Sequence, residues 1–79
     1  MATDEEIAAA LMAFAAARGP GKTFCPSEVA RGLAPEWRPL MPDVRRVAQT
    51  LPLVATQRGV PVELDQARGP IRLRLAAKN

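Results

Sequence analysis

Hydrophobic residues recur at helical spacing in the first part of the chain. They fall three or four positions apart, at Ile7, Leu11 and Phe14, so one face of a helix collects them. The segment Thr3-Asp4-Glu5-Glu6 precedes them and matches a capping box, in which the Thr3 hydroxyl and the Glu6 carboxylate bond each other's backbone N–H groups. Gly19-Pro20-Gly21 interrupts the pattern. The sequence therefore predicts a first helix from about Asp4 to Ala17.

A second, shorter helix is predicted to begin at Pro26. Proline fits the first helical position, where its missing N–H has no helical partner. Glu28 stands three residues after Cys25, where the acid of a capping box belongs, although a thiol is a poorer cap than a hydroxyl. Val29 is expected to face inward, and the helix ends near Pro35. Thr23 and Phe24, just before it, are expected to form a short strand.

A third helix is expected to begin between Pro39 and Pro42, since either proline fits a first turn. It is expected to have about 11 residues and to end at Pro52. Its apolar side is predicted to comprise Leu40, Met41, Val44, Val47, Ala48 and Leu51. Its polar side is predicted to comprise Asp43, Arg45, Arg46, Gln49 and Thr50.

After Pro52 the pattern changes from helical spacing to alternation, which is typical of strands. Leu53 to Gln57 is predicted to be a strand, and Arg58-Gly59 is a turn signal. Ile71 to Leu75 is the clearest alternation, with three apolar residues on one face and two arginines on the other. The predicted order is therefore helix, short strand, helix, helix, strand, long turn, strand.

This order is that of an α+β winged helix, with three helices and a C-terminal β-hairpin wing. We expect residues 1–79 to form a single domain, and the long turn from about Arg58 to Arg68 to be the wing. A different three-helix domain capped by a hairpin has the same element order, so the order alone does not distinguish the two topologies.

Composition is ordinary for a globular domain, with 48% hydrophobic residues, but charge is unevenly distributed. Residues 1–37 contain three basic and five acidic residues, a net charge of −2, whereas residues 38–79 contain eight basic and three acidic residues, a net charge of +5. A basic half favours a polyanionic partner. An equally weighted alternative is that GC-rich coding sequence supplies some of the arginines.

Several functional classes are disfavoured by what the chain lacks. It contains no histidine, one cysteine and no phosphate-binding glycine loop, so we expect no enzyme activity, no catalytic residues, no metal and no cofactor. No apolar run approaches the ~20 residues of a membrane span, and acids, not bases, precede the apolar stretch that begins at Ile7. The protein is therefore expected to be cytoplasmic.

Short segments along nearly the whole chain resemble one bacterial family. They are Arg18-Gly19-Pro20, Lys22-Thr23, Cys25-Pro26-Ser27-Glu28-Val29-Ala30-Arg31, Trp37-Arg38, Leu40-Met41, Val44-Arg45, Thr56-Gln57 and Gly69-Pro70-Ile71-Arg72. The family is DUF3253, and the Cys25 to Arg31 segment is the most specific part of the resemblance. The resemblance implies a domain of unknown function with a winged-helix-like fold, and it implies no activity.

The leading candidate site lies on the third helix and the wing. In a winged helix the third helix usually enters the major groove of DNA and the wing contacts phosphates or the minor groove. Arginine can bind guanine, and glutamine adenine, through two hydrogen bonds. The predicted DNA-binding residues are Arg45, Arg46, Gln49, Thr50, Arg58 and Arg68. The competing interpretation is an ordinary solvated helix face, with Arg45 tied to Glu28 or Asp43.

Other residues are first interpreted structurally. Trp37, the only tryptophan, is expected to anchor the core, and Cys25 to pack as a small half-buried residue, with a redox-sensing thiol as the less favoured alternative. Arg18, Arg31 and Arg38 are expected to pair with Glu28 and Glu36. For Arg72 and Arg74, protection of an edge strand and binding of an acidic partner are equally favoured.

Two functions follow from these observations. The first is a module that binds double-stranded DNA through the third helix and the wing. The alternative is a protein-interaction module on the same scaffold that binds no nucleic acid, which the modest net charge of +3 favours. The scarcity of aromatic residues argues against stacking on single strands.

Overall fold

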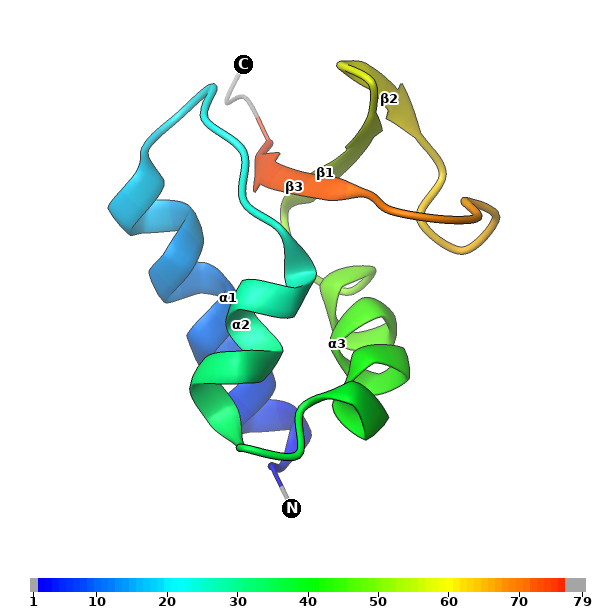
Figure 1. The fold of residues 1–79 in the computed structure, drawn as a ribbon. Helices are drawn as coiled ribbons and strands as arrows, with labels where there is room; N and C mark the ends of the chain where they lie inside the picture. The colour runs from blue at the N-terminus through cyan, green and yellow to red at the C-terminus, as the bar shows by residue number, and fades with distance from the viewer. Residues whose placement is uncertain (1, 77–79) are drawn as a thin grey trace.

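A computed structural model describes residues 2–76 and shows three helices followed by a small antiparallel sheet (Figure 1). The helical elements are α1 (Asp4–Arg18), α2 (Pro26–Leu33), the short 3-10 helix η1 (Arg38–Leu40) and α3 (Met41–Ala48). The strands are β1 (Leu53–Gln57), β2 (Val60–Val62) and β3 (Arg72–Leu75). This is an α+β fold with the element order of a winged helix, as the sequence predicts.

Local capping signals position the first two helices. At α1 the Glu6 N–H donates to the Thr3 hydroxyl at 3.1 Å, and the Thr3 N–H donates to the Glu6 carboxylate at 2.9 Å. At α2 the Cys25 N–H donates to Glu28 Oε2 at 2.8 Å, so the acid caps the helix although the N-cap residue is a thiol. Both capping predictions are confirmed.

The third helix is shorter than the sequence predicts. It ends at Ala48 and not at Leu51, and the N–H groups of Gln49, Thr50 and Leu51 each bond a carbonyl three residues back, at 2.9–3.3 Å. The physical reason is Pro52, whose ring disfavours helical backbone at the preceding residue, so the last turn tightens. Gln49 and Thr50 therefore follow α3 and do not lie on its face.

The sheet has the strand order β2-β1-β3, with both pairs antiparallel. Phe24 extends it on the far side of β3, because Phe24 and Leu73 exchange two backbone hydrogen bonds of 2.8 Å. The short strand predicted at residues 23–24 is thus a single bridge at Phe24. This bridge ties the segment between α1 and α2 to the last strand.

The wing contains a strand that the long-turn prediction omitted. Arg58 (φ 54°) and Gly59 (φ 81°) both have positive φ. They form a tight turn that joins β1 to β2 and has a twist that matches the twist of the strands. β2 is an edge strand, so Pro61 does not remove a hydrogen bond from the centre of the sheet. Residues 63–71 then return the chain to β3. The wing is therefore this hairpin together with the loop that follows it.

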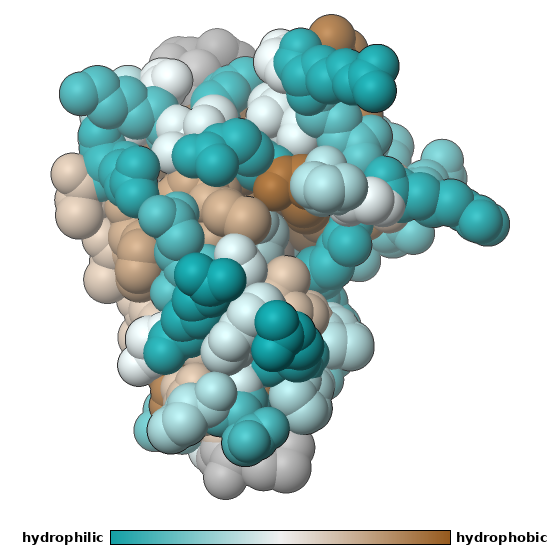
Figure 2. All heavy atoms as spheres, viewed as in Figure 1, coloured by the Kyte–Doolittle hydropathy of each residue, from teal (hydrophilic) through white to brown (hydrophobic). Residues whose placement is uncertain are grey.

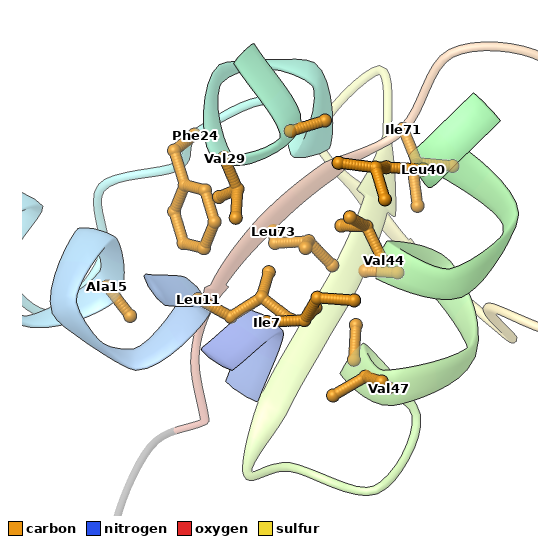
Figure 3. Close-up of a cluster of buried hydrophobic side chains, with 13 residues drawn as sticks. Ile7, Leu11, Ala15, Phe24, Val29, Leu40, Val44, Val47, Ile71 and Leu73 are labelled. Carbon is orange, nitrogen blue, oxygen red and sulfur yellow. The ribbon is translucent and has the colours of Figure 1, made fainter. Parts of the chain in front are cut away.

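One hydrophobic core joins the helices to the sheet (Figure 3). Leu73 of β3 lies at its centre, between Phe24 and Val29 on one side and Val44 of α3 on the other (Figure 3). The fully or almost fully buried hydrophobic residues are Ile7, Leu11, Ala15, Phe24, Val29, Ala30, Leu40, Val44, Val47, Ala48, Ala55, Ile71 and Leu73. Each predicted helix and strand thus contributes its apolar side to one shared core.

Candidate nucleic-acid interface

Arg46, predicted to face DNA, forms ion pairs within the protein. Its guanidinium donates two hydrogen bonds to the Asp4 carboxylate, at 2.8 and 2.9 Å, and a third to Asp43 at 3.3 Å. The hydrogen bond from Arg46 lowers the pKa of Asp4, and the bonds to Asp4 and Asp43 raise the pKa of Arg46. Arg46 therefore joins the start of α1 to α3, with its charge matched by two carboxylates.

Arg45 connects α3 to the wing. Its Nη2 donates to the backbone carbonyl of Ala67 at 3.1 Å, and the side chain is half-buried. The sequence favours Glu28 or Asp43 as its partner, and the structure corrects that interpretation. Because Ala67 lies in the loop between β2 and β3, Arg45 positions the wing against the helix.

Gln49 and Thr50 lie beyond the C-terminal end of α3. Thr50 donates its hydroxyl hydrogen to the carbonyl of Val47 at 2.7 Å, so this group is engaged in ending the helix. Gln49 is exposed and borders a groove of about 440 Å³ between the end of α3 and the wing. Glu63 and Asp65 line the same groove. A polyanion would meet two carboxylates beside Gln49.

Arg58 and Arg68 come together on the wing. Together with Arg72 they line a second groove, of about 710 Å³, and residues of β2 also line this groove. Within residues 2–76 neither Arg58 nor Arg68 has an ion-pair or hydrogen-bond partner for its side chain, and both are exposed. Hydrophilic residues dominate the projecting part of the surface at the right of Figure 2, where Figure 1 places the loop after β2.

Backbone contacts hold this groove in shape. The Gln57 amide donates to the carbonyl oxygens of Arg68 and Pro70, which ties the returning loop to the end of β1. Arg72 donates to the hydroxyl of Thr23 at 2.8 Å and to its carbonyl at 3.1 Å. Arg72 thus holds the position of β3 and adds a positive charge near the groove. The side chains of Arg58 and Arg68, which also line the groove, have no partner within residues 2–76.

Trp37 packs against the edge of the core, so the predicted core anchor is confirmed only in part. It is half-buried at the junction of α2 and η1, and two guanidinium carbons lie over its ring, Arg31 at 4.8 Å and Arg38 at 4.6 Å from the centroid. Pro35 follows the end of α2 and Pro39 lies within η1, so Trp37 falls in the short connection between these two helices. The sequence contains no pattern that predicts this contact of Arg31 and Arg38 with Trp37, because the contact depends on the path of the chain after α2.

The predicted ion pairs are therefore only partly observed. Arg18 pairs with Glu28 at 2.8 Å, as predicted. In the part of the chain that the structure describes, Arg31 and Arg38 have no carboxylate within ion-pairing distance and contact Trp37 instead. Cys25 is half-buried, with its Sγ 3.0 Å from the Ser27 hydroxyl.

Residues 2–76 contain no group of three or more potential metal ligands, and no helix among them is long and apolar enough to cross a membrane. Exposed arginines that have no carboxylate partner in this part of the chain lie on the wing and beside Trp37.

Three lowered carboxylate pKa values predict a loss of stability in acid. Hydrogen bonds from Arg46, from the Thr3 N–H and from the Cys25 N–H lower the pKa of Asp4, Glu6 and Glu28 respectively. Since each pKa is below its unfolded value, the stabilisation is complete above about pH 5 and is lost as the pH falls through the folded-state pKa values. We expect the free energy of unfolding, measured with urea, to be level from neutral pH to about pH 5 and to fall below it.

The variant Arg46→Gln supplies the control for this prediction. It removes the partner of Asp4 and leaves Glu6 and Glu28 with their backbone donors. Its stability should fall less steeply with acid than that of the wild type. An equally steep fall in both proteins would show that the Asp4–Arg46 pair contributes nothing to the pH dependence.

Three helices, a bridging residue between α1 and α2, and a sheet with a projecting wing define the class as an α+β domain of winged-helix type. The family model described as "Protein of unknown function (DUF3253)" matches residues 4–76, and the chain belongs to this family. This confirms the resemblance seen in the sequence. No curated protein matches the chain.

Proposed function

We propose that the domain binds double-stranded DNA, with the wing arginines on the phosphate backbone and α3 directed at the major groove. The observation that carries this proposal is the pair Arg58 and Arg68, which line one groove and have no partner within residues 2–76. Exposed guanidiniums without carboxylates nearby are the groups that contact phosphates in protein–DNA complexes.

The engagement of the helix arginines shapes the kind of binding proposed. Arg46 is neutralised by Asp4 and Asp43, and Arg45 holds the wing through Ala67. Neither is free to read a guanine edge without breaking these contacts, which leaves Gln49 as the exposed polar residue at this end of the helix. The proposed binding is therefore dominated by phosphate contacts, is tolerant of sequence and depends strongly on salt.

The wing pair can be tested with the double variant Arg58→Gln/Arg68→Gln. Each phosphate contact contributes about 0.9 to the slope of log affinity against log salt, so losing two should reduce the slope by about 1.8. Binding of a labelled duplex of random sequence is measured by anisotropy over a series of salt concentrations. Affinity at low salt should fall with the slope.

The matched control is Lys22→Gln/Arg74→Gln, which also removes two positive charges but leaves the wing groove intact. If the slope fell equally in this control, binding would follow net charge alone. If the wing variant kept the wild-type slope and affinity, the wing assignment would be wrong.

A second candidate is a protein-interaction module. The groove beside Gln49 favours it, because Glu63 and Asp65 flank apolar residues there, including Leu53 and Leu64, and repel phosphates. A wild-type protein that fails to bind duplex DNA even at about 50 mM salt would favour this alternative.

A further inference from the structure

Four exposed arginines that have no carboxylate partner within residues 2–76 form two groups at opposite ends of α3. Arg58 and Arg68 belong to the wing, which follows the C-terminal end of α3 through β1. Arg31 and Arg38 lie with Trp37 at the other end, where η1 leads directly into α3. Figure 1 shows the wing and the segment between α2 and α3 at opposite ends of that helix.

Contact with Trp37 holds the two guanidiniums in place and leaves their N–H donors available to an anion. A guanidinium over an indole ring is held by the cation–π attraction, which is worth about 0.5–1 kcal/mol at an exposed site. The N–H donors on its edge stay free, and here no side-chain hydrogen bond from Arg31 or Arg38 occurs within residues 2–76. Within the same residues, Glu36, which precedes Trp37 in the chain, forms no ion pair with Arg31 or Arg38.

The helical segment between the two groups is longer than the major groove of duplex DNA is wide. Three residues of 3-10 helix at about 2.0 Å each and eight of α-helix at about 1.5 Å each give about 18 Å from Arg38 to the end of α3. The major groove of B-DNA is about 12 Å wide. A helix of this length directed across the groove would place Arg31 and Arg38 beside one bordering phosphate strand and the wing, which continues from its other end through β1, beside the other.

We infer that Arg31, Trp37 and Arg38 form a second phosphate-contact site, which holds the DNA strand opposite to the one that the wing contacts. This inference rests on the proposed function and adds to it the second strand and the residues that bind it. Trp37 positions the two arginines, and their guanidinium edges donate hydrogen bonds to phosphate oxygens.

The test compares wild type with Arg31→Gln/Arg38→Gln in the duplex titration used for the wing. The variant should lose about 1.8 from the slope of log affinity against log salt, for two phosphate contacts. Trp37 is the only tryptophan, so its emission reports on this site alone. Emission should change when wild type or the wing variant binds DNA, and this change should be absent in Arg31→Gln/Arg38→Gln.

Two of the possible outcomes distinguish this inference from the proposed function. A reduced slope for the wing variant alone, with no change in Trp37 emission on binding, would keep the proposed function and overturn the second site. A reduced slope for Arg31→Gln/Arg38→Gln alone would keep the second site and overturn the wing assignment. Absence of duplex binding by the wild type at low salt would overturn both.

Poly-glutamate serves as the probe for an acidic protein partner. The inference expects weaker binding of poly-glutamate than of duplex DNA at equal charge concentration, because an unstructured chain does not present two strands to the two ends of α3. Equal affinity with the same Trp37 response would assign the cluster to acidic peptides and overturn the DNA assignment. A circular dichroism melt confirms that each double variant is folded.

Discussion

Phe24→Ala should lower the free energy of unfolding by about 3–5 kcal/mol, the usual cost of deleting a buried phenylalanine side chain. Phe24 is fully buried, its ring lies 5.9 Å from that of Phe14, and its backbone joins Leu73 of β3. A 79-residue domain has about 4–12 kcal/mol of total stability. The loss is therefore a large share of the total stability, and the urea midpoint should fall accordingly.

Urea denaturation followed by circular dichroism measures this loss, and Phe14→Ala is the matched control. Phe14 is the same residue type in contact with the same core, but it is only half-buried. Its truncation should cost less than half as much, because water already reaches part of the side chain. Equal losses in the two variants would show that Phe24 is not the anchor between the helices and the sheet.

Features of the fold that depend on near neighbours in the chain are predicted well from the sequence. The capping boxes at Thr3 and Cys25 involve residues three positions apart, so the helix starts follow from local spacing. The alternation in residues 71–75 gives the inward face of β3 directly. The end of α3 was predicted less well, because Pro52 acts on the turn before it and not only on its own position.

The candidate site was harder to predict because its contacts join distant parts of the chain. Arg46 and Asp4 are 42 positions apart, and their pairing requires α1 and α3 to pack side by side. A polar helix face in the sequence looks the same whether its arginines are free or paired. Only the fold separates Arg46, matched by two carboxylates, from Arg58 and Arg68, which are left exposed.

This separation gives the arginines two distinct roles. Those at Arg18, Arg45, Arg46 and Arg72 bond other parts of the protein and hold the helices, the wing and the sheet together. Those at Arg31, Arg38, Arg58 and Arg68 remain available at the two ends of α3. Substituting the first group should therefore affect stability before binding, and substituting the second should affect binding before stability.

Leu73→Ala is the second substitution expected to have a large effect, with a loss of about 2–5 kcal/mol in the free energy of unfolding. Leu73 is almost fully buried at the centre of the core, opposite Ala55 of β1 and bridged to Phe24 (Figure 3). Buried residues of α1, α2 and α3 surround its side chain (Figure 3), so a cavity there cannot be filled by movement of one element alone.

Leu75→Ala is the control for this substitution, since Leu75 lies two residues further along β3 on the same face and is only half-buried. Both variants remove the same atoms from the same strand, so the difference between their urea midpoints reports burial and not strand propensity. We expect the larger loss at Leu73. A larger loss at Leu75 would place the centre of the core nearer the C-terminal end of β3 and contradict the packing described above.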